Sequence, residues 1–379
     1  MKSRAFDVRR WWAVVGKEFI QMRRDRLTFA MMIGIPLLQL ILFGYAINAD
    51  PKHLPTAVLS ADNGVFSRTL VWALRNSDYF EIVREARSEA EVRRLLALGS
   101  VQFVLHIPED FSRKLLRGER PALLLEADAT DPVATGGALA AIAGLAGSAL
   151  DRDLVGPLAG LRAAPGPIEL RTHRHYNPET ITQYNIVPGL MGVVLTMTMV
   201  IITAVAITRE RERGTMENLL ATPARPGEVM LGKIVPYILV GYVQVLLILL
   251  AARLLFDVPR VGSVPLLLGV MLLFITANLA MGITFSTMAT TQLQAMQMAF
   301  FFFLPSLMLS GFMFPFRGMP AWAQVLGEAL PLTHFLRIVR GILLKGNGAA
   351  EIAPEVWPIA LFTLLVMSLG IKRYRRTLD

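Results

Sequence analysis

The sequence predicts a mainly α-helical membrane protein. Six transmembrane helices are expected, with an α/β extracytoplasmic domain inserted between helices 1 and 2. Three observations support this fold class. The 379-residue chain is 54% hydrophobic, with a mean hydropathy of +0.50, which is too apolar for a soluble globule. Several uncharged runs are long enough for a helix to cross a bilayer, and a charged, strand-rich segment, 50–180, separates the first run from the others.

The first 48 residues are predicted to form a cytosolic interfacial connecting helix, 1–26, and the first span, 27–48. The interfacial segment carries eight Lys and Arg residues, and its apolar side chains recur at helical spacing. A basic helix with tryptophan on its apolar side is expected to lie in the membrane interface. The residues expected on that side include Trp11, Trp12, Val15 and Phe19.

Residues 50–180 are predicted to form a water-soluble α/β domain, because short β-rich runs alternate with helical segments. Ser88 and Glu91 form a capping box that starts one helix, and Gly99 ends it. Residues 132–150 are uncharged and long enough to span a membrane. They consist mostly of small residues that drive insertion weakly, so we expect a helix of the soluble domain instead. The predicted strands are 56–60, 79–83, 101–107, 122–126 and 168–172.

The rest of the chain is predicted to supply five more spans. Residues 261–316 carry no charge and are too long for one crossing, so they are divided near 289–294. Residues 317–350 are amphipathic and interrupted by Pro320 and Pro331, which predicts short re-entrant helices at the outer surface. The predicted spans are 181–208, 230–256, 262–288, 293–316 and 355–372, followed by a cytosolic tail, 373–379.

Positive charge predicts the orientation. The segments 1–26, 209–233 and 372–379 carry eight, five and four Lys and Arg residues and lie on one side if there are six spans. The positive-inside rule places them, and both termini, in the cytosol. Residues 50–180 hold 15 of the 38 Lys and Arg residues and 17 of the 29 Asp and Glu residues. The rest of the chain therefore has 38 − 15 = 23 basic and 29 − 17 = 12 acidic residues. The net charge of +9 therefore indicates orientation, and nucleic-acid binding is not expected.

A charged island, 209–226, lies between the second and third spans. Met216, Leu219 and Leu220 share one side of an expected short helix along the membrane surface. Thr222 precedes Pro223, which disfavours further helix. Such a helix would dock a partner; a solvated loop kept charged for topology is the alternative.

Together these features resemble the permease subunit of ABC-2 type exporters, in particular the bacterial inner-membrane, drug-efflux-like permeases with an extracytoplasmic domain. The extracytoplasmic domain matches in kind more than in motif. The matching stretches, in order, are His175-Tyr-Asn-Pro178, Ile186-Val-Pro-Gly189, Arg209-Glu-Arg-Glu-Arg-Gly-Thr-Met-Glu217 with Thr222-Pro223, Gly232-Lys-Ile-Val-Pro-Tyr237, Leu309-Ser-Gly-Phe-Met-Phe-Pro315 with Met319-Pro320, Pro331-Leu332 and Val339-Arg-Gly341.

The resemblance implies that 209–226 is a coupling helix that binds in a groove of a separate ATPase subunit. It also implies that the interfacial helix, 1–26, contacts the same ATPase. The contact residues of the coupling helix would be Arg209, Glu210, Arg211, Glu212, Arg213, Gly214, Thr215, Met216, Glu217, Leu219, Leu220, Thr222 and Pro223. It also implies that the second and fifth spans line a substrate route between two permease subunits. Candidate route residues are Met191, Met197, Met298, Phe301 and Met308, for which ordinary packing is the alternative.

The implied activity is export of drug-like or other amphipathic substrates from the cytoplasm or inner membrane. The implied partners are the ATPase, a second permease copy or a related permease, and membrane lipids. A periplasmic adaptor with an outer-membrane channel would extend the assembly. Two alternatives stay open: export of a lipid-linked glycan or envelope component, and a receptor or scaffold without transport, which would purify without an ATPase.

Catalytic and metal sites are not expected in this chain. Residues 227–234 nearly match a phosphate-binding loop, but Ile234 replaces the Ser or Thr that binds Mg²⁺. ATP and Mg²⁺ are therefore expected on the partner ATPase, and no cofactor on this chain. His173 and His175 flank Arg174 without an evident third ligand, so they are interpreted as surface residues.

Overall fold

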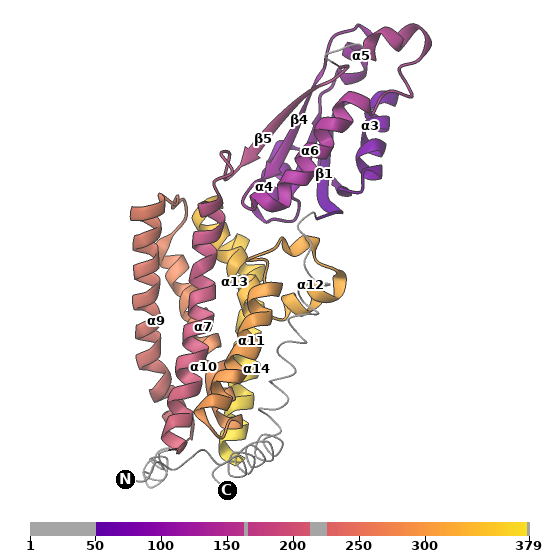
Figure 1. Ribbon diagram of the computed structural model, residues 1–379. Helices are drawn as coiled ribbons and strands as arrows, with labels where there is room; N and C mark the ends of the chain where they lie inside the picture. Colours follow the sequence, from indigo (N-terminus) through magenta and orange to yellow (C-terminus); the bar gives the residue numbers. More distant parts are fainter. Residues whose placement is uncertain (1–50, 163–165, 213–225, 377–379) are drawn as a thin grey trace, which may run out of the picture.

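The computed structural model describes residues 51–162, 166–212 and 226–376. An α/β domain lies at one end of a bundle of long helices (Figure 1). Five helices in the described part are long and apolar enough to cross a membrane, which confirms the mainly helical membrane class. The predicted interfacial helix 1–26, with Trp11, Trp12, Val15 and Phe19, and the predicted first span 27–48 lie outside the described residues, so the count of six spans stays a prediction.

The α/β domain is built on a five-stranded sheet with the order β2-β1-β3-β4-β5. β1 runs parallel to β2 and β3, β3 and β4 are antiparallel, and β4 and β5 are parallel. Each predicted strand is confirmed within a few residues. The strands are β1 (Leu54–Ser60), β2 (Phe80–Glu85), β3 (Phe103–Ile107), β4 (Ala122–Asp128) and β5 (Glu169–His175).

Helices cover the two faces of this sheet. Phe103 and Leu105 belong to a core shared with α3 (Val65–Asn76), α5 (Phe111–Leu116) and α6 (Pro132–Ser148). On the other face α4 (Glu89–Ala97) packs against Ala57 and Val104. The predicted caps of α4 are confirmed: Ser88 Oγ accepts the Glu91 N–H at 3.2 Å, and Gly99 follows the helix with φ +67°. A short 3₁₀ segment, Gly156–Arg162, precedes β5.

The uncharged segment 132–150 belongs to the soluble domain, as predicted. Ala138 and Ile142 of α6 are buried in the sheet core together with Phe103. Asp131 caps the helix, its Oδ1 accepting the N–H groups of Val133 and Ala134 at 3.1 and 3.3 Å. The small residues that make membrane insertion weak also let the helix approach the sheet closely.

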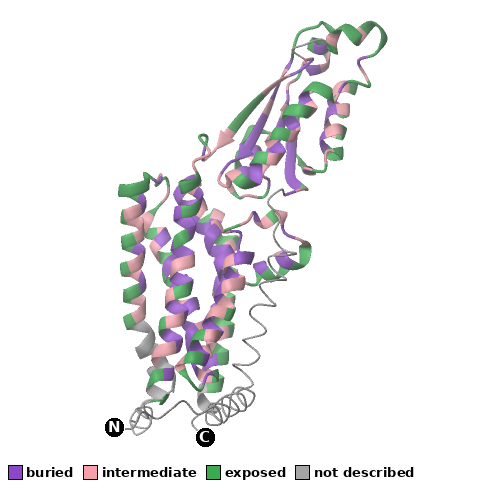
Figure 2. Ribbon diagram, in the orientation of Figure 1, coloured by how far each residue is buried: buried purple, intermediate pink, exposed green. Residues whose placement is uncertain are grey.

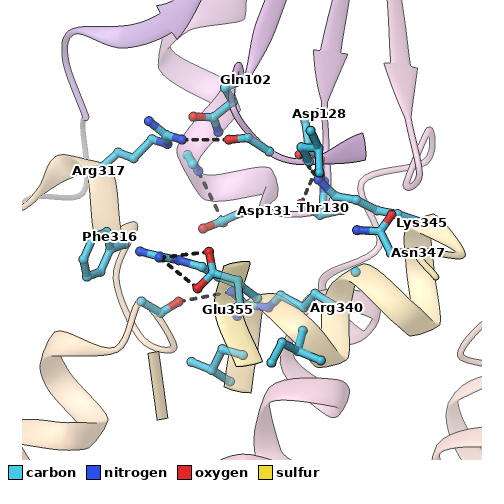
Figure 3. Close-up of a pocket in the computed structure, with 18 of the residues that line it drawn as sticks. Gln102, Asp128, Thr130, Asp131, Phe316, Arg317, Arg340, Lys345, Asn347 and Glu355 are labelled. Carbon is cyan, nitrogen blue, oxygen red and sulfur yellow. Dashed lines mark hydrogen bonds and ion pairs between the residues drawn. The ribbon is translucent and has the colours of Figure 1, made fainter. Parts of the chain in front are cut away.

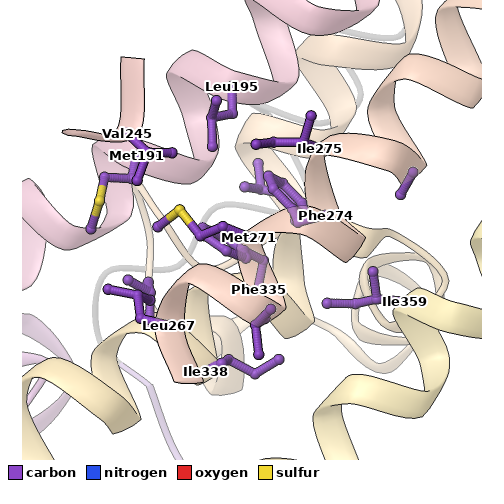
Figure 4. Packing of buried hydrophobic residues seen from close by; sticks show 14 of the residues in the cluster. Met191, Leu195, Val245, Leu267, Met271, Phe274, Ile275, Phe335, Ile338 and Ile359 are labelled. Atoms are coloured by element: carbon purple, nitrogen blue, oxygen red, sulfur yellow. The ribbon is translucent and has the colours of Figure 1, made fainter. Parts of the chain in front are cut away.

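The bundle contains α7 (Thr182–Glu212), α9 (Pro226–Phe256), α10 (Val264–Met288), α11 (Gln292–Leu309) and α14 (Ala349–Arg376). α10 is central and packs against each of the others. Its Phe274 stacks on Phe335 with ring centroids 4.0 Å apart, inside an apolar core that also holds Met191 and Ile359 (Figure 4). The break between α10 and α11 falls at 289–291, inside the predicted interval.

Two predicted span limits are wrong. The fifth span was expected to reach residue 316, but α11 ends at Leu309, and Gly311, with φ +82°, takes the chain out of helical geometry. The last span was expected at 355–372, but α14 begins at Ala349 and contains Pro354 and Pro358. Proline is tolerated within membrane helices where neighbouring groups satisfy the freed carbonyl.

Short helices join α11 to α14 beside the α/β domain, over the segment 317–350 where they were predicted. Pro320 is the N-cap of α12 (Ala321–Glu328), and Pro331 opens α13 (Pro331–Arg340). A 3₁₀ turn, Phe316–Gly318, comes before them and a π-helical turn, Gly341–Lys345, after them. We call α12, α13 and this π-helical turn the domain-side helices.

Exposure differs sharply among the long helices. α9 and α14 expose large apolar side chains such as Leu247 and Leu364, whereas α7 and α10 are largely buried (Figure 2). Apolar faces of this size need lipid or a partner to cover them. The exposed faces therefore agree with a membrane environment for the bundle.

Candidate functional site

The end of α7 farthest from the α/β domain is bonded to the start of α11. The backbone N–H of Gln292 donates to Glu212 Oε1 at 2.7 Å, and its side-chain amide donates to Oε2 at 2.5 Å. Arg209 Nε donates to Gln292 Oε1 at 3.3 Å. The pKa of Glu212 is held below its usual value, chiefly by the hydrogen bond from the side-chain amide of Gln292 and next by the bond from its backbone N–H. The charged island therefore leaves α7 at a point already tied to α11.

Glycines set the close packing of α7 inside the bundle. A Cβ on Gly282 of α10 would lie 2.6 Å from the Val200 carbonyl oxygen of α7, and a Cβ on Gly192 of α7 would lie 2.7 Å from the Phe335 ring of α13. Small residues allow such backbone approach between membrane helices. Movement of α7 must therefore be shared with α10 and α13.

The candidate route residues on α7 and α11 fall into two groups. Met191, Met298 and Met308 are buried within this chain, against α10, Ala204 of α7 and Met319 respectively. Met197 is 38% exposed and Phe301 is 40% exposed. The two exposed side chains are accessible on the surface of the bundle, whereas the three buried ones pack inside it.

A polar cavity of about 370 Å³ lies between the α/β domain and the domain-side helices (Figure 3). Around it three side chains donate to carbonyls at the C-terminal end of α4. Lys345 Nζ donates to Leu96 O at 3.1 Å, Asn347 Nδ2 to Ala97 O at 3.0 Å and Arg317 Nη2 to Gly99 O at 2.9 Å. Cationic donors are favourable there because helix carbonyls are unpaired and the dipole is negative.

Lys345 also joins the two parts of the molecule by charge. Its Nζ lies 2.5 Å from Asp128 Oδ2 at the end of β4, and the two side chains are only 9% and 10% exposed. From α7, Asn185 Nδ2 donates to Asp131 at 3.3 Å. We call these bonds, together with the three to the end of α4, the interdomain contact. They hold the α/β domain to both α7 and the domain-side helices.

An ion-pair network ties the domain-side helices together. Arg337 Nη2 lies 2.5 Å from Glu328 Oε1 of α12, and its Nη1 lies 3.3 Å from Glu355 Oε2 of α14. His334 Nδ1 lies 2.6 Å from the same Glu355 oxygen, and its Nε2 lies 2.8 Å from Glu328 O. One turn of α13 therefore bonds to both of its neighbours.

Arg340 and Asp131 both line the cavity, and the guanidinium of Arg340 is only partly hydrogen-bonded. Nε and Nη2 of Arg340 are buried without a hydrogen bond, while Nη1 donates to Gly311 O at 3.3 Å. Burial raises the pKa of Asp131, although the charge of Arg340 and the two capping N–H groups act against that shift. The cavity suits water or a small polar molecule more than an apolar drug.

Comparison with known proteins shows the family to which this chain belongs. Residues 26–372 match the family described as ABC-2 family transporter protein. This chain is an ABC-2 family member. It is 28% identical to "Probable multidrug ABC transporter permease YbhR" of Escherichia coli K12, over 97% of this chain and 98% of that protein. It is 29% identical to "Probable multidrug ABC transporter permease YbhS" of the same strain, over 100% of both chains.

A third relative is "Inner membrane transport permease YhhJ" of Escherichia coli K12, which is 28% identical over 90% of this chain and 93% of that protein. The chain is thus a multi-pass membrane protein related to ABC transporter permease subunits. Of the expected ATPase-contacting residues of this ABC-2 chain, Arg209 and Glu212 lie at the end of α7, and Glu210 and Arg211 belong to the same helix. The others, Arg213 to Pro223, lie outside the described residues.

Several contacts of the ABC-2 chain were missed by sequence reasoning. Lys345 and Asp128 are 217 residues apart, and no local pattern pairs them. His173 is exposed, as interpreted from the sequence, and His175 is half-buried; the nearness of Glu126 of β4 to both was not foreseen. His173 and His175 lie just beyond the predicted strand 168–172, and Glu126 ends the predicted strand 122–126; this nearness to two strand ends was the one available sign. Residues 227–234, which nearly match a phosphate-binding loop, lie within helix α9.

Proposed function

We propose that this chain is the transmembrane subunit of an ATP-binding cassette exporter that moves drug-like or other amphipathic substrates out of the cytoplasm or inner membrane. A separate ATPase subunit binds ATP and Mg²⁺, and this chain binds no nucleotide cofactor. Family membership and the two multidrug-permease relatives support the substrate class and the need for an ATP-binding partner.

The observation that carries the proposal is the contact between Glu212 and Gln292. In this proposal the segment 209–226 docks on the ATPase from the cytosol. Because Glu212 is bonded to the first residue of α11, a displacement of that segment moves α7 and α11 together. These two helices carry the exposed side chains Met197 and Phe301. The segment can therefore pass motion directly to the helices that would bound a substrate route.

The route is proposed to lie between two permease subunits, either two copies of this chain or this chain and a related one. Within one subunit the described helices pack tightly around α10, and the polar cavity lies beside the α/β domain. ATP binding would favour one of two arrangements of the paired subunits and hydrolysis the other. The α/β domain, placed outside the cell membrane, would be available to a periplasmic adaptor with an outer-membrane channel.

The test is charge reversal in the proposed coupling segment. Glu210→Lys combined with Glu217→Lys should leave the permease in the membrane and its bound ATPase active. ATP-driven uptake of a fluorescent amphipathic dye into inverted vesicles, which corresponds to export from the cell, should fall at least tenfold. Glu119→Lys, an exposed change at the far end of the α/β domain, is the matched control and should transport normally.

Undiminished dye export by the double variant would refute coupling through this segment. Purification of the unmodified permease from its native host without any ATPase would favour a receptor or scaffold. Normal ATP-driven movement of a lipid-linked glycan, with no dye export, would assign the chain to envelope assembly instead.

A further inference from the structure

Three potential metal ligands gather on the open part of the sheet in the α/β domain. His173 and His175 alternate on β5 and therefore point to the same face. Glu126 of β4 pairs with His173 in the strand register, so its carboxylate lies on that face too. α4 covers the same face over β1 and β3, whereas His173 on the edge strand β5 is exposed. The fold thus presents two imidazoles and a carboxylate together.

Their spacing fits a transition-metal ion. One ligand atom from each of the three residues lies within 4.8 Å of the other two, and His175 Nε2 is 3.1 Å from Glu126 Oε2. In a tetrahedral zinc site, bonds of about 2.0–2.1 Å place neighbouring ligand atoms about 3.3 Å apart. The closest pair already has that spacing, and a side-chain rotation of His173, which is exposed, would bring the third ligand in.

Hydrogen bonding within the cluster does not satisfy these groups. His175 Nε2 is buried and makes no hydrogen bond, although Glu126 Oε2 lies 3.1 Å away. His106 Nε2 is also buried without a hydrogen bond, 3.6 Å from the other oxygen of Glu126. Glu126 itself is only 8% exposed. A buried carboxylate between imidazole nitrogens without hydrogen bonds needs a compensating positive charge, which a bound metal ion would supply.

We propose that Glu126, His173 and His175 bind a divalent transition-metal ion of the zinc class, with solvent as the fourth ligand. Two imidazoles, a carboxylate and an open position form a donor set used by zinc in proteins. His106, whose Nδ1 lies 3.4 Å from Glu89 Oε1, is a positioning residue that orients Glu126.

The bound ion would connect β4 to β5 beside the interdomain contact. β5 ends at His175 and continues through Asn177, which bonds to the backbone of Ile181 just before α7. Asp128, two residues beyond Glu126, carries the ion pair to Lys345. The metal would therefore stiffen the strand pair through which the α/β domain joins α7. This inference does not depend on the transported substrate.

The experiment measures Zn²⁺ binding to the full-length permease in lipid nanodiscs, purified with an affinity tag that contains no histidine. All five histidines of the chain lie in described residues, so each can be tested by substitution. Calorimetry should show one equivalent of Zn²⁺ bound by the unmodified protein. Co²⁺ at the same site should give the visible absorption of a tetrahedral complex, and Zn²⁺ should remove it.

Substitutions distinguish the proposed metal ligands from the other histidines of the chain. His173→Ala, His175→Ala and Glu126→Gln should each abolish the stoichiometric binding and the Co²⁺ spectrum. His106→Ala should keep the stoichiometry and lower the affinity by about 10–100-fold, as expected for a residue that orients a ligand. His53→Ala is the matched control, because His53 also has a carboxylate neighbour, Asp78 at 3.4 Å, but lies outside the cluster.

The proposal is overturned if the unmodified protein binds no stoichiometric Zn²⁺, or if His173→Ala binds it as tightly as the His53→Ala control. Circular dichroism of each variant shows whether the domain is folded. Should a variant unfold, His173→Gln, at an exposed position, gives the same test without disturbing the core. Dye export that fails while Zn²⁺ binding persists would count against the proposed function alone.

Discussion

At the scale of single residues, burial decides which ion pairs matter. Lys345 and Asp128 are each about 10% exposed, so neither charge has water to replace its partner. Arg171 and Glu169 form a pair at 2.9 Å on the domain surface, with side chains 65% and 45% exposed. Exposed pairs contribute little to stability, whereas an orphaned buried charge is strongly destabilising.

Lys345→Met is therefore expected to weaken the interdomain contact. It leaves Asp128 buried without a counter-charge and removes a donor to Leu96 O, at a cost of about 3 kcal/mol. Thermal unfolding of the purified permease, together with protease sensitivity near Asn177, measures the loss. Arg171→Ala is the control and should leave both unchanged. Equal melting temperatures of Lys345→Met and Arg171→Ala would contradict the stabilising role of Lys345 in the interdomain contact. Adding Asp128→Asn to Lys345→Met should recover part of the lost stability.

Asp131 should give the permease a recognisable pH dependence. Burial raises the pKa of Asp131 in the folded protein above its unfolded value, so the folded state binds this proton more readily. Its contribution to stability is then greatest below the unfolded pKa and falls as pH rises through the folded pKa. Asp131→Asn keeps a good helix cap but removes the titration.

Melting curves of both forms between pH 4 and pH 8 provide the test. The unmodified protein should lose stability relative to Asp131→Asn as the pH rises. A change of the opposite sign would show that the charge of Arg340, rather than burial, dominates the pKa of Asp131.

At the scale of helices, α10 acts as the support around which the others pack. Its Gly282 touches the α7 backbone, whereas a Cβ added to its Gly269 would meet no heavy atom within 4 Å. α10 therefore contains one glycine with no room for a Cβ, Gly282, and one with room for it, Gly269. This contrast makes the closeness of α7 and α10 directly testable.

Gly282→Ala is expected to push α7 away from α10 and destabilise the bundle by about 1–3 kcal/mol, as overpacking does. Gly269→Ala should be neutral or slightly stabilising, because alanine favours helix. Unfolding of both variants in a mild detergent, followed by tryptophan fluorescence, measures the difference. Identical unfolding would show that α7 and α10 are not in backbone contact.

At the scale of the whole molecule, a polar α/β domain lies at one end of an apolar bundle. We therefore expect residues of the domain and residues at the other end of the bundle to lie on opposite sides of the membrane. The chain has no cysteine, so single cysteines report position without background. Glu119, at the far end of the domain, and Lys372, near the end of α14, are both exposed. They are natural labelling positions.

In spheroplasts, a membrane-impermeant maleimide should label Glu119→Cys and spare Lys372→Cys. Inverted vesicles should give the reverse pattern, because the positive charge near Lys372 favours the cytosol. Labelling of both residues from the same side would overturn the proposed orientation. Permeabilised cells, in which both cysteines react, control for access.

Local patterns in the sequence determined the class of this protein, its five strands, the caps of α4 and the break between α10 and α11. Each depends on periodicity, capping or charge within a few residues. The limits of the fifth and last spans were predicted wrongly, because whether a helix ends at Gly311 or continues through Pro354 depends on neighbouring helices that satisfy its backbone. Only the tertiary structure paired Lys345 with Asp128, Glu212 with Gln292 and Glu126 with His175, because contacts between residues tens to hundreds of positions apart follow from how elements pack and leave no periodic trace in the chain.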